Sequence, residues 1–342
     1  MNFFLRKFFS LILSIIWSKL IIINLFLLDK LSKKKYLYNN SGGFGDTYDF
    51  FLETYTLINR NQDFIPLSYT QYQKSIVDFL FQKKKNIFFS IPKFIPTYPT
   101  ISKIKKSKYF TPYLNVSFIS SGIQDLKKLN NNSTYELLNQ KLLKSEISKD
   151  LLFLQNENYL CLHIKHYDNK IDNLNGAHSR QTTRLEKVFS LINYLLKNKI
   201  KVLILGNKYD KFIPIIKQKM EKKIIFKNST NKIFFLENLS NKYSFADQVF
   251  ATKHSKGYVG SAAGMANLFY FLKRKSICFD TFYYKKFENV YNKKYRKYLY
   301  KKIEIGTKFS ILKDSSLEIK KKYKIHETST IELLKVVKNF LL

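Results

Sequence analysis

The second half of the chain alternates apolar, strand-like runs with amphipathic, helix-like runs from Tyr159 to Asp280. Strands are expected at residues 159–167, 200–205, 233–237, 256–260 and 276–280. Helices are expected at residues 182–199, 209–221, from 244 onward and at 263–275. Such a succession predicts an α/β fold, a parallel doubly wound sheet with helices on both faces. Because ligands of these sheets bind at the carboxyl ends of the strands, candidate functional residues are sought there.

Two of these helices carry start signals. The helix at 182–199 has apolar residues spaced i, i+3, i+4 and i+7, and Thr183 with Glu186 has the spacing of a capping box. Ser244 lies three residues before Asp247, an arrangement that opens another helix.

The first half indicates a further α/β domain less clearly. A strand at 36–39 is followed by the turn SGGFGD and by an apolar-periodic run through Tyr55, and further strands are expected at 86–90 and 116–119. Region 61–115 holds five of the six Pro residues, which indicates an irregular part of this domain. Residues 130–134 have the polar composition of a loop.

The N-terminal segment at 8–28 contains 21 residues with one charge, Lys19, and is flanked by basic residues on both sides. It is long enough to span a bilayer and lacks a small-residue cleavage site. Lys19 and Trp17 also suit a helix lying in the membrane interface, and a helix packed on the globular body is a third reading. Membrane contact is favoured, and the Lys-rich flank after the segment favours a catalytic body on the cytosolic side.

Because Lys is abundant in this chain and Arg is rare, the few Arg positions are candidate functional residues. The net charge of +35 comes from Lys spread along the whole chain, beside abundant Asn, Ile, Phe and Tyr, which indicates drift toward AT-rich codons. The hydrophobic content excludes a disordered protein, and the absence of a nucleic-acid-binding motif disfavours specific nucleic-acid binding. Only six Arg remain, and two of them, Arg180 and Arg184, lie four residues apart. Cys161 and Cys278 lie in apolar runs and are expected to be buried thiols without a disulfide.

The turn GYVGSAAG at 257–264 is the first candidate ligand site. The backbone N–H groups of the helix that follows would face outward with a partial positive charge, which suits a diphosphate. Small residues in such a turn also let a helix pack closely on a strand, and that alternative has equal weight. The candidate residues here are Gly260, Ser261, Ala262 and Gly264.

The segments HIKHY and HSRQTTR form the second candidate. His163 and Lys165 are expected on one face at the end of a strand, with Arg180 in the following loop and Arg184 in the first helical turn. A cation at a helix N-terminus is unfavourable unless it meets an anion, and Arg grips a phosphate through two hydrogen bonds. Surface ion pairs with Glu186 or Asp172 are the alternative.

Two further turns are weaker candidates. In LGNK, Gly206 permits a tight turn after a strand and Lys208 could contact phosphates. In SGGFGDTYD, the glycines allow close approach of the backbone, and Asp46 could take a proton from an acceptor hydroxyl, although it also suits a helix N-cap. The candidate residues in the latter turn are Gly43, Gly45 and Asp46. The segment lacks the GK[ST] of a P-loop.

Together, HIKHY, SRQTTRLEKVFSLINYL, VLILGNK and YVGSAAG resemble a family of bacterial glycosyltransferases with two Rossmann-like domains, the GT-B architecture, and GGFGD is similar to a turn of heptosyltransferase-like proteins. The resemblance covers about half of the chain. Lys165 stands where the family pattern has Arg, and Ala262 and Ala263 replace hydroxyl residues. The run HETSTIELLKVVKNFL is similar to the closing helix of that family.

The resemblance implies an N-terminal acceptor domain and a C-terminal donor domain. The expected limits are 1–35 for the apolar segment, 36–150 for the acceptor domain, 151–315 for the donor domain and 316–342 for the closing helix. The expected activity is transfer of a sugar from a nucleotide sugar to a cell-surface glycan or a lipid-linked acceptor, at the cytoplasmic face of the bacterial inner membrane. Asp46 or His163 would be the base.

No Asp-x-Asp sequence occurs in the chain, which suits metal-independent chemistry without a cofactor other than the nucleotide-sugar co-substrate. Two alternatives stay open: a pyruvyl transferase on the same architecture, and a non-enzymatic basic protein that binds nucleic acid or anionic lipid.

Overall fold

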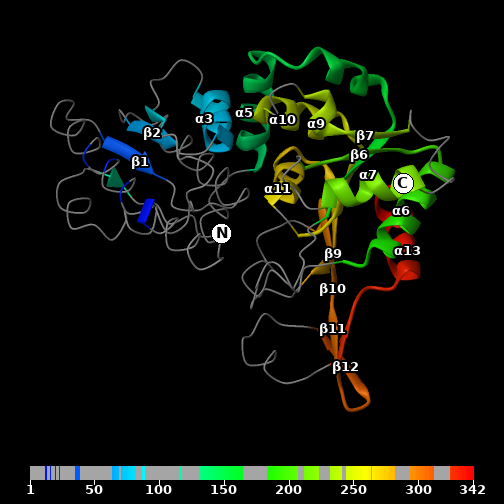
Figure 1. Cartoon of the computed structure of the whole chain (residues 1–342). Coiled ribbons are helices and arrows are strands. Elements are labelled where there is room, and N and C mark those ends of the chain that lie inside the picture. The colour runs from blue at the N-terminus through cyan, green and yellow to red at the C-terminus, as the bar shows by residue number, and fades with distance from the viewer. Residues whose placement is uncertain are drawn as a thin grey trace. The chain divides into compact units, whose positions relative to one another are not determined.

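The computed structural model describes a defined part of the chain. Described are residues 35–38, 64–68, 71–81, 87–88, 116–117, 131–164, 183–206, 212–222, 232–240, 244–262, 264–281, 293–311 and 324–342, with single positions between 12 and 23. The chain divides into two compact units, Met1–Asn130 and Asn131–Leu342 (Figure 1).

The first unit contains a parallel sheet of four strands. Its strands are β1 (Lys35–Tyr38), β2 (Phe64–Ser68), β3 (Ile87–Phe88) and β4 (Val116–Ser117). They lie in the order β3-β2-β1-β4, and helix α3 (Gln71–Phe81) connects β2 to β3. This topology is that of a Rossmann-like half, so an α/β first unit is confirmed. The expectation that 61–115 is irregular was wrong, because β2, α3 and β3 all lie within it.

The second unit is built on a sheet of six parallel strands. They are β5 (Tyr159–His163), β6 (Lys201–Ile204), β7 (Ile233–Phe235), β8 (Gly257–Gly260), β9 (Lys275–Thr281) and β10 (Arg296–Tyr300). The order is β10-β9-β8-β5-β6-β7. The chain therefore runs outward from β5 to β7 and then returns to place β8 on the other side of β5. This reversal between β5 and β8 is a topological switch point, and it confirms the doubly wound fold.

Helices precede, connect and follow the strands of this sheet along the chain. They are α5 (Asn131–Leu143), α6 (Leu185–Lys197), α7 (Phe212–Lys222), α9 (Leu236–Leu239), α10 (Phe245–His254), α11 (Gly264–Phe271) and α13 (Thr330–Phe340), with the 3₁₀ helix η2 (Lys149–Asn156). The side chains of Ser244 and Ser329 cap α10 and α13 by accepting hydrogen bonds from backbone N–H groups three residues on.

The core of the second unit lies between the sheet and these helices. Strand residues such as Leu162 and Val202 pack against the apolar face of α6, which includes Val188 and Ile192. Leu333 and Val337 of α13 join the same cluster, so the closing helix belongs to this unit. Cys161 and Cys278 are buried free thiols, as expected.

A smaller antiparallel sheet follows β10. Strands β11 (Lys302–Ile305) and β12 (Lys308–Ile311) form a hairpin, and β13 (Lys324–His326) pairs with the other edge of β11. Gly306 has a φ of 60°, which suits the tight turn between β11 and β12. Figure 1 shows the hairpin projecting beyond β9 and β10.

The structure corrects two expectations for residue 130 onward. Residues 131–134 open helix α5 and do not form a loop, because Asn and Ser are also frequent at helix starts. Helix α6 begins at Leu185 after Arg184, so the capping box of Thr183 with Glu186 does not form.

The expected N-terminal apolar helix lies mostly outside the described residues. None of the helices in the described part of the chain combines the length and hydrophobicity that crossing a bilayer requires.

Candidate functional site

The carboxyl ends of β5 and β8 meet at the topological switch point. His163 is the last residue of β5 and pairs in register with Gly260, the last residue of β8. Gly260 in turn pairs with Cys278 of β9, which continues to Asp280 at the same edge. The expected candidates His163, Gly260 and Ser261 are therefore brought together where doubly wound sheets bind ligands.

Close packing explains why residue 260 is glycine. A Cβ placed there would lie 2.1 Å from the carbonyl oxygen of His163 and 2.7 Å from the hydroxyl oxygen of Tyr258. The N–H of Ser261 donates to the carbonyl oxygen of His163 at 2.9 Å. The Tyr258 hydroxyl donates to the carbonyl oxygen of Ser261 at 2.7 Å and lies 3.3 Å from that of His163. These contacts hold the ends of β5 and β8 close together. They agree with the expectation that small residues in this turn permit close packing.

Helix α11 begins directly after this turn. Ser261 is buried, Ala262 is half-buried, and Gly264 is the first helical residue. The helix start therefore lies at the carboxyl edge of the sheet, beside the end of β5. Its first-turn N–H groups carry the partial positive charge that makes such a position suitable for a phosphate.

Arg184 lies at a second helix start on the same edge. It is exposed at the N-cap position of α6, and its side chain makes no capping hydrogen bond. The preceding Thr183 is buried, and its hydroxyl donates to the Asp280 carboxylate at 2.9 Å. The Thr183 hydroxyl, which a capping box would direct to the start of α6, therefore bonds to the buried Asp280 carboxylate instead.

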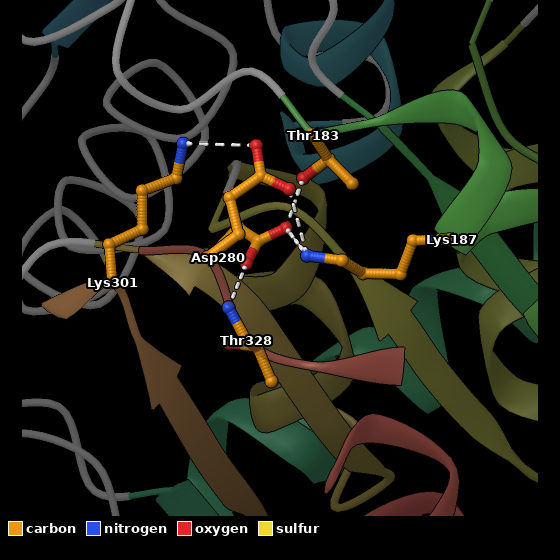
Figure 2. A network of polar contacts seen from close by, with 6 residues as sticks. Thr183, Lys187, Asp280, Lys301 and Thr328 are labelled. Atoms are coloured by element: carbon orange, nitrogen blue, oxygen red, sulfur yellow. Dashed lines mark hydrogen bonds and ion pairs between the residues drawn. The ribbon is translucent and has the colours of Figure 1, made fainter. Parts of the chain in front are cut away.

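Asp280 is the centre of a buried polar network at the end of β9 (Figure 2). Its Oδ2 accepts from the Nζ of Lys187 at 2.6 Å, besides the bond from Thr183, and its Oδ1 accepts from the backbone N–H of Thr328 at 2.8 Å. Asp280 has a φ of 50°, a left-handed conformation that Asp tolerates better than most residues. The carboxylate thus joins β9, α6 and the segment leading into α13.

Two further charged residues complete this network. Lys187 also donates to Glu327 at 3.0 Å, and the Nζ of Lys301 lies 4.0 Å from the same carboxylate. Burial lowers the pKa of Lys301, while the nearby Asp280 and Glu327 carboxylates act in the opposite direction. Lys187 and Arg184 lower the pKa of Lys301 further, which places Arg184 within electrostatic reach of the network.

Seven of the predicted site residues lie within the described part of the chain, and six lie outside it. His163, Gly260, Ser261, Ala262, Gly264 and Arg184 lie at one edge of the second unit's sheet. Gly206 follows β6 with a φ of 120°, which suits the expected turn. The remaining candidates lie outside the described residues: Gly43, Gly45, Asp46, Lys165, Arg180 and Lys208.

Sequence reasoning missed the network around Asp280. Its one signal was a carboxylate at the end of an apolar strand, in SICFD. Among the described residues, no group of His, Cys, Asp and Glu side chains is arranged to hold a metal ion.

No family model matches the chain, and no curated protein matches it. Among solved structures, the chain is similar to ADP-heptose LPS heptosyltransferase II of E. coli, with 12% identity, coverage of 90% of this chain and 98% of that chain, and a TM-score of 0.49. It is also similar to a glycosyl transferase of family 9 from Veillonella parvula, with 9% identity, coverage of 88% and 80%, and a TM-score of 0.36.

A third similar structure is UDP-GlcNAc 2-epimerase of Methanocaldococcus jannaschii in complex with UDP-GlcNAc and UDP, with 14% identity, coverage of 87% and 82%, and a TM-score of 0.33.

Proposed function

We propose that this chain is a glycosyltransferase that binds a nucleotide-sugar donor at the carboxyl edge of β5 and β8. The observation that carries the proposal is the arrangement at the switch point. There the start of α11, the end of β5 and the exposed Arg184 at the start of α6 share one edge of a doubly wound sheet. Two helix starts and a guanidinium at one edge suit a diphosphate.

Arg184 and the start of α11 would act on the diphosphate that leaves during sugar transfer. The acceptor hydroxyl attacks the anomeric carbon, and the bond from that carbon to the diphosphate oxygen breaks. Negative charge then grows on the diphosphate, where Arg184 and the N–H groups of the α11 start stabilise it. Arg180 and Lys208 are proposed as further phosphate contacts. This arrangement would let the reaction proceed without a divalent ion.

His163 is proposed as one of two candidates for the base. It ends β5 at the switch point, and its backbone is fixed by the hydrogen bond from Ser261. The imidazole would take the proton of the acceptor hydroxyl as the new glycosidic bond forms. Asp46 of the first unit is the other candidate, and its carboxylate would take the same proton.

We also propose that the acceptor is a cell-surface glycan or a lipid-linked precursor at the cytoplasmic face of the bacterial inner membrane. The apolar segment 8–28 and the basic residues that flank it support this location. The first unit would bind the acceptor and the second unit the donor.

Calorimetric titration of the full chain with a panel of nucleoside diphosphates tests the donor site. We expect one base to bind best, and Arg184→Ala to weaken that binding by about tenfold or more, since a charge-assisted hydrogen bond is worth about 1.5–3 kcal/mol. Lys197→Ala removes an exposed cation from the other end of α6 and serves as the matched control, with unchanged binding.

Two outcomes contradict the proposal. Absence of binding for every nucleoside diphosphate removes the donor site, and equal effects of Arg184→Ala and Lys197→Ala remove the role of Arg184. Titration with phosphoenolpyruvate addresses the pyruvyl transferase alternative, which predicts binding of that compound in place of nucleotides.

A further inference from the structure

The β11–β12 hairpin exposes large apolar side chains that the folding of the second unit does not use. Phe309 is 60% exposed and Ile311 is 43% exposed, both on β12. Each residue of β12 is exposed, and so are Gly306 and Thr307 in the turn. Such exposed apolar groups on an edge strand are unusual, because edge strands are normally protected by charged residues.

The hairpin has two different faces. Residues opposite one another in an antiparallel pair share a face, so Phe309 and Ile311 lie on the same face as Lys302 and Glu304. Ile303 belongs to the other face and is buried. Ser310 and Ile325 lie on that face too and are exposed, so it is only partly covered. The face with Phe309 and Ile311, here called the outward face, contains no buried residue among those whose exposure is described. An outward face of an antiparallel sheet is normally polar.

The charges of the outward face favour an anionic partner. Glu304 pairs with His326 at 2.7 Å, and the His326 ring also contacts the Phe309 ring edge-on, with centroids 5.0 Å apart. The carboxylate of this face therefore has a cationic or hydrogen-bonding partner within the sheet. Lys302 on the same face is exposed and positively charged, while Lys308, which pairs with Ile305, is exposed on the opposite face beside the turn.

Aromatic and aliphatic side chains between lysines are the combination that binds the interface of an anionic bilayer. The apolar groups enter the boundary between headgroups and acyl chains, while the ammonium groups stay among the lipid phosphates. The chain's net charge of +35 adds a long-range attraction to the same kind of surface.

We propose that the β11–β12 hairpin is a membrane-docking surface, which inserts Phe309 and Ile311 into the interface of an anionic bilayer and places Lys302, on the same face, at its headgroups. The proposal extends the membrane location proposed above to a named surface of the second unit. It does not depend on sugar transfer, because the hairpin contains none of the proposed donor-site residues.

A fluorophore placed on the hairpin tests this surface directly. Phe309→Cys in the full chain is labelled with an environment-sensitive dye, and the buried native thiols Cys161 and Cys278 are protected from the label. Ile331→Cys is the matched control, because Ile331 is 81% exposed on α13 of the same unit. The probes are vesicles of equimolar phosphatidylglycerol and phosphatidylcholine, and vesicles of phosphatidylcholine alone.

We expect the dye at position 309 to shift to shorter wavelength with the anionic vesicles and to be quenched by lipids that carry a quencher near the headgroup. The dye at 331 stays unchanged. Because the measurement is local, it reports on the hairpin even if residues 8–28 also hold the chain on the vesicle. Equal responses at 309 and 331, or no response at 309, overturn the proposal.

Substitution of the two apolar side chains supplies a second measurement. Phe309→Ser with Ile311→Ser is expected to lower partitioning onto anionic vesicles by about tenfold, while Ile331→Ser leaves it unchanged. Nucleotide binding by the double variant should equal that of the unmodified chain, which separates this proposal from the donor site. A dye at 309 that responds to duplex RNA and not to vesicles assigns the surface to another polyanion and also overturns the proposal.

Discussion

Replacing Asp280 with Asn tests whether its charge holds the carboxyl edge of the second unit together. The substitution keeps the size of the side chain, and Asn tolerates the left-handed backbone at this position. The amide oxygen can still accept from the N–H of Thr328. The amide nitrogen, however, would face the Thr183 hydroxyl and the Lys187 ammonium group, which both donate to Asp280 in the present structure.

The expected loss of stability follows from the charges. In the network, Lys187 and Lys301 are balanced by Asp280 and Glu327, and Asp280 is 1% exposed. Removing one partner of a buried ion pair costs about 3–5 kcal/mol. Because Lys187 retains Glu327 at 3.0 Å, we expect a value near the lower end, about 3 kcal/mol.

A pH dependence follows from Lys301. Its pKa is already lowered by burial, and loss of the Asp280 charge would lower it further. The unfolded chain then binds more protons than the folded chain between the folded pKa of Lys301 and its ordinary value of 10.5. Stability of Asp280→Asn should therefore rise with pH in that window, more steeply than stability of the unmodified chain.

Urea denaturation followed by circular dichroism measures these values. Hydrogen exchange of peptides from α6 and β9 assigns the loss to the second unit. In the double variant Asp280→Asn with Lys187→Met, one positive and one negative charge are removed together, so about 1–2 kcal/mol should be regained. A loss below about 1 kcal/mol for Asp280→Asn, or additive effects in the double variant, would refute the role assigned to the carboxylate.

Three smaller changes have expected outcomes of their own. Gly260→Ala should cost about 3 kcal/mol in urea denaturation, because its Cβ would meet the carbonyl oxygen of His163, and wild-type stability would contradict this close packing. Tyr258→Phe should cost about 1 kcal/mol through the lost bond to Ser261, and a neutral result would show that this bond does not stabilise the turn. Burial, Lys253 and Arg274 lower the pKa of His254, so stability should fall as the pH drops from 6.5 through that lowered value. Thermal melts of His254→Asn should lack this component, and an unchanged pH profile would exclude it.

The order of elements in the second unit could be predicted because its residues carry a clear periodicity. Apolar runs such as VLIL and the amphipathic spacing of α6 identify strand and helix directly. The position of β8 beside β5 could not be read from these runs, since neighbouring strands are chosen by the packing of the whole sheet. Only that placement brings His163 and Gly260 together.

The hydrogen-bond partners of Asp280 could not be predicted from sequence patterns, because these patterns relate only residues that are near one another in the chain. Thr183 and Lys187 are 97 and 93 residues away in the chain, and Thr328 is 48 residues away. Thr183 is an example: its spacing to Glu186 in the sequence is that of a capping box. In the folded unit its hydroxyl instead donates to the buried carboxylate of Asp280, a charge-assisted bond that is stronger than a neutral cap.

The start of α5 was misread for a different reason. Asn131, Asn132 and Ser133 have side chains that compete for backbone hydrogen bonds, and such residues occur both in loops and at helix starts. The apolar residues that follow, among them Leu138 and Leu142, are buried and decide in favour of the helix.

Hydrogen exchange with a saturating nucleoside diphosphate tests the central claim, that the donor binds at the carboxyl edge of β5 and β8. The best ligand from the calorimetric panel is added to the full chain, and exchange is compared with that of the free chain. We predict slower exchange in peptides that cover the Ser261–Gly264 turn, the first turn of α11 and the start of α6, with the amino ends of the same strands unchanged. Protection that leaves the turn and both helix starts untouched would contradict the account.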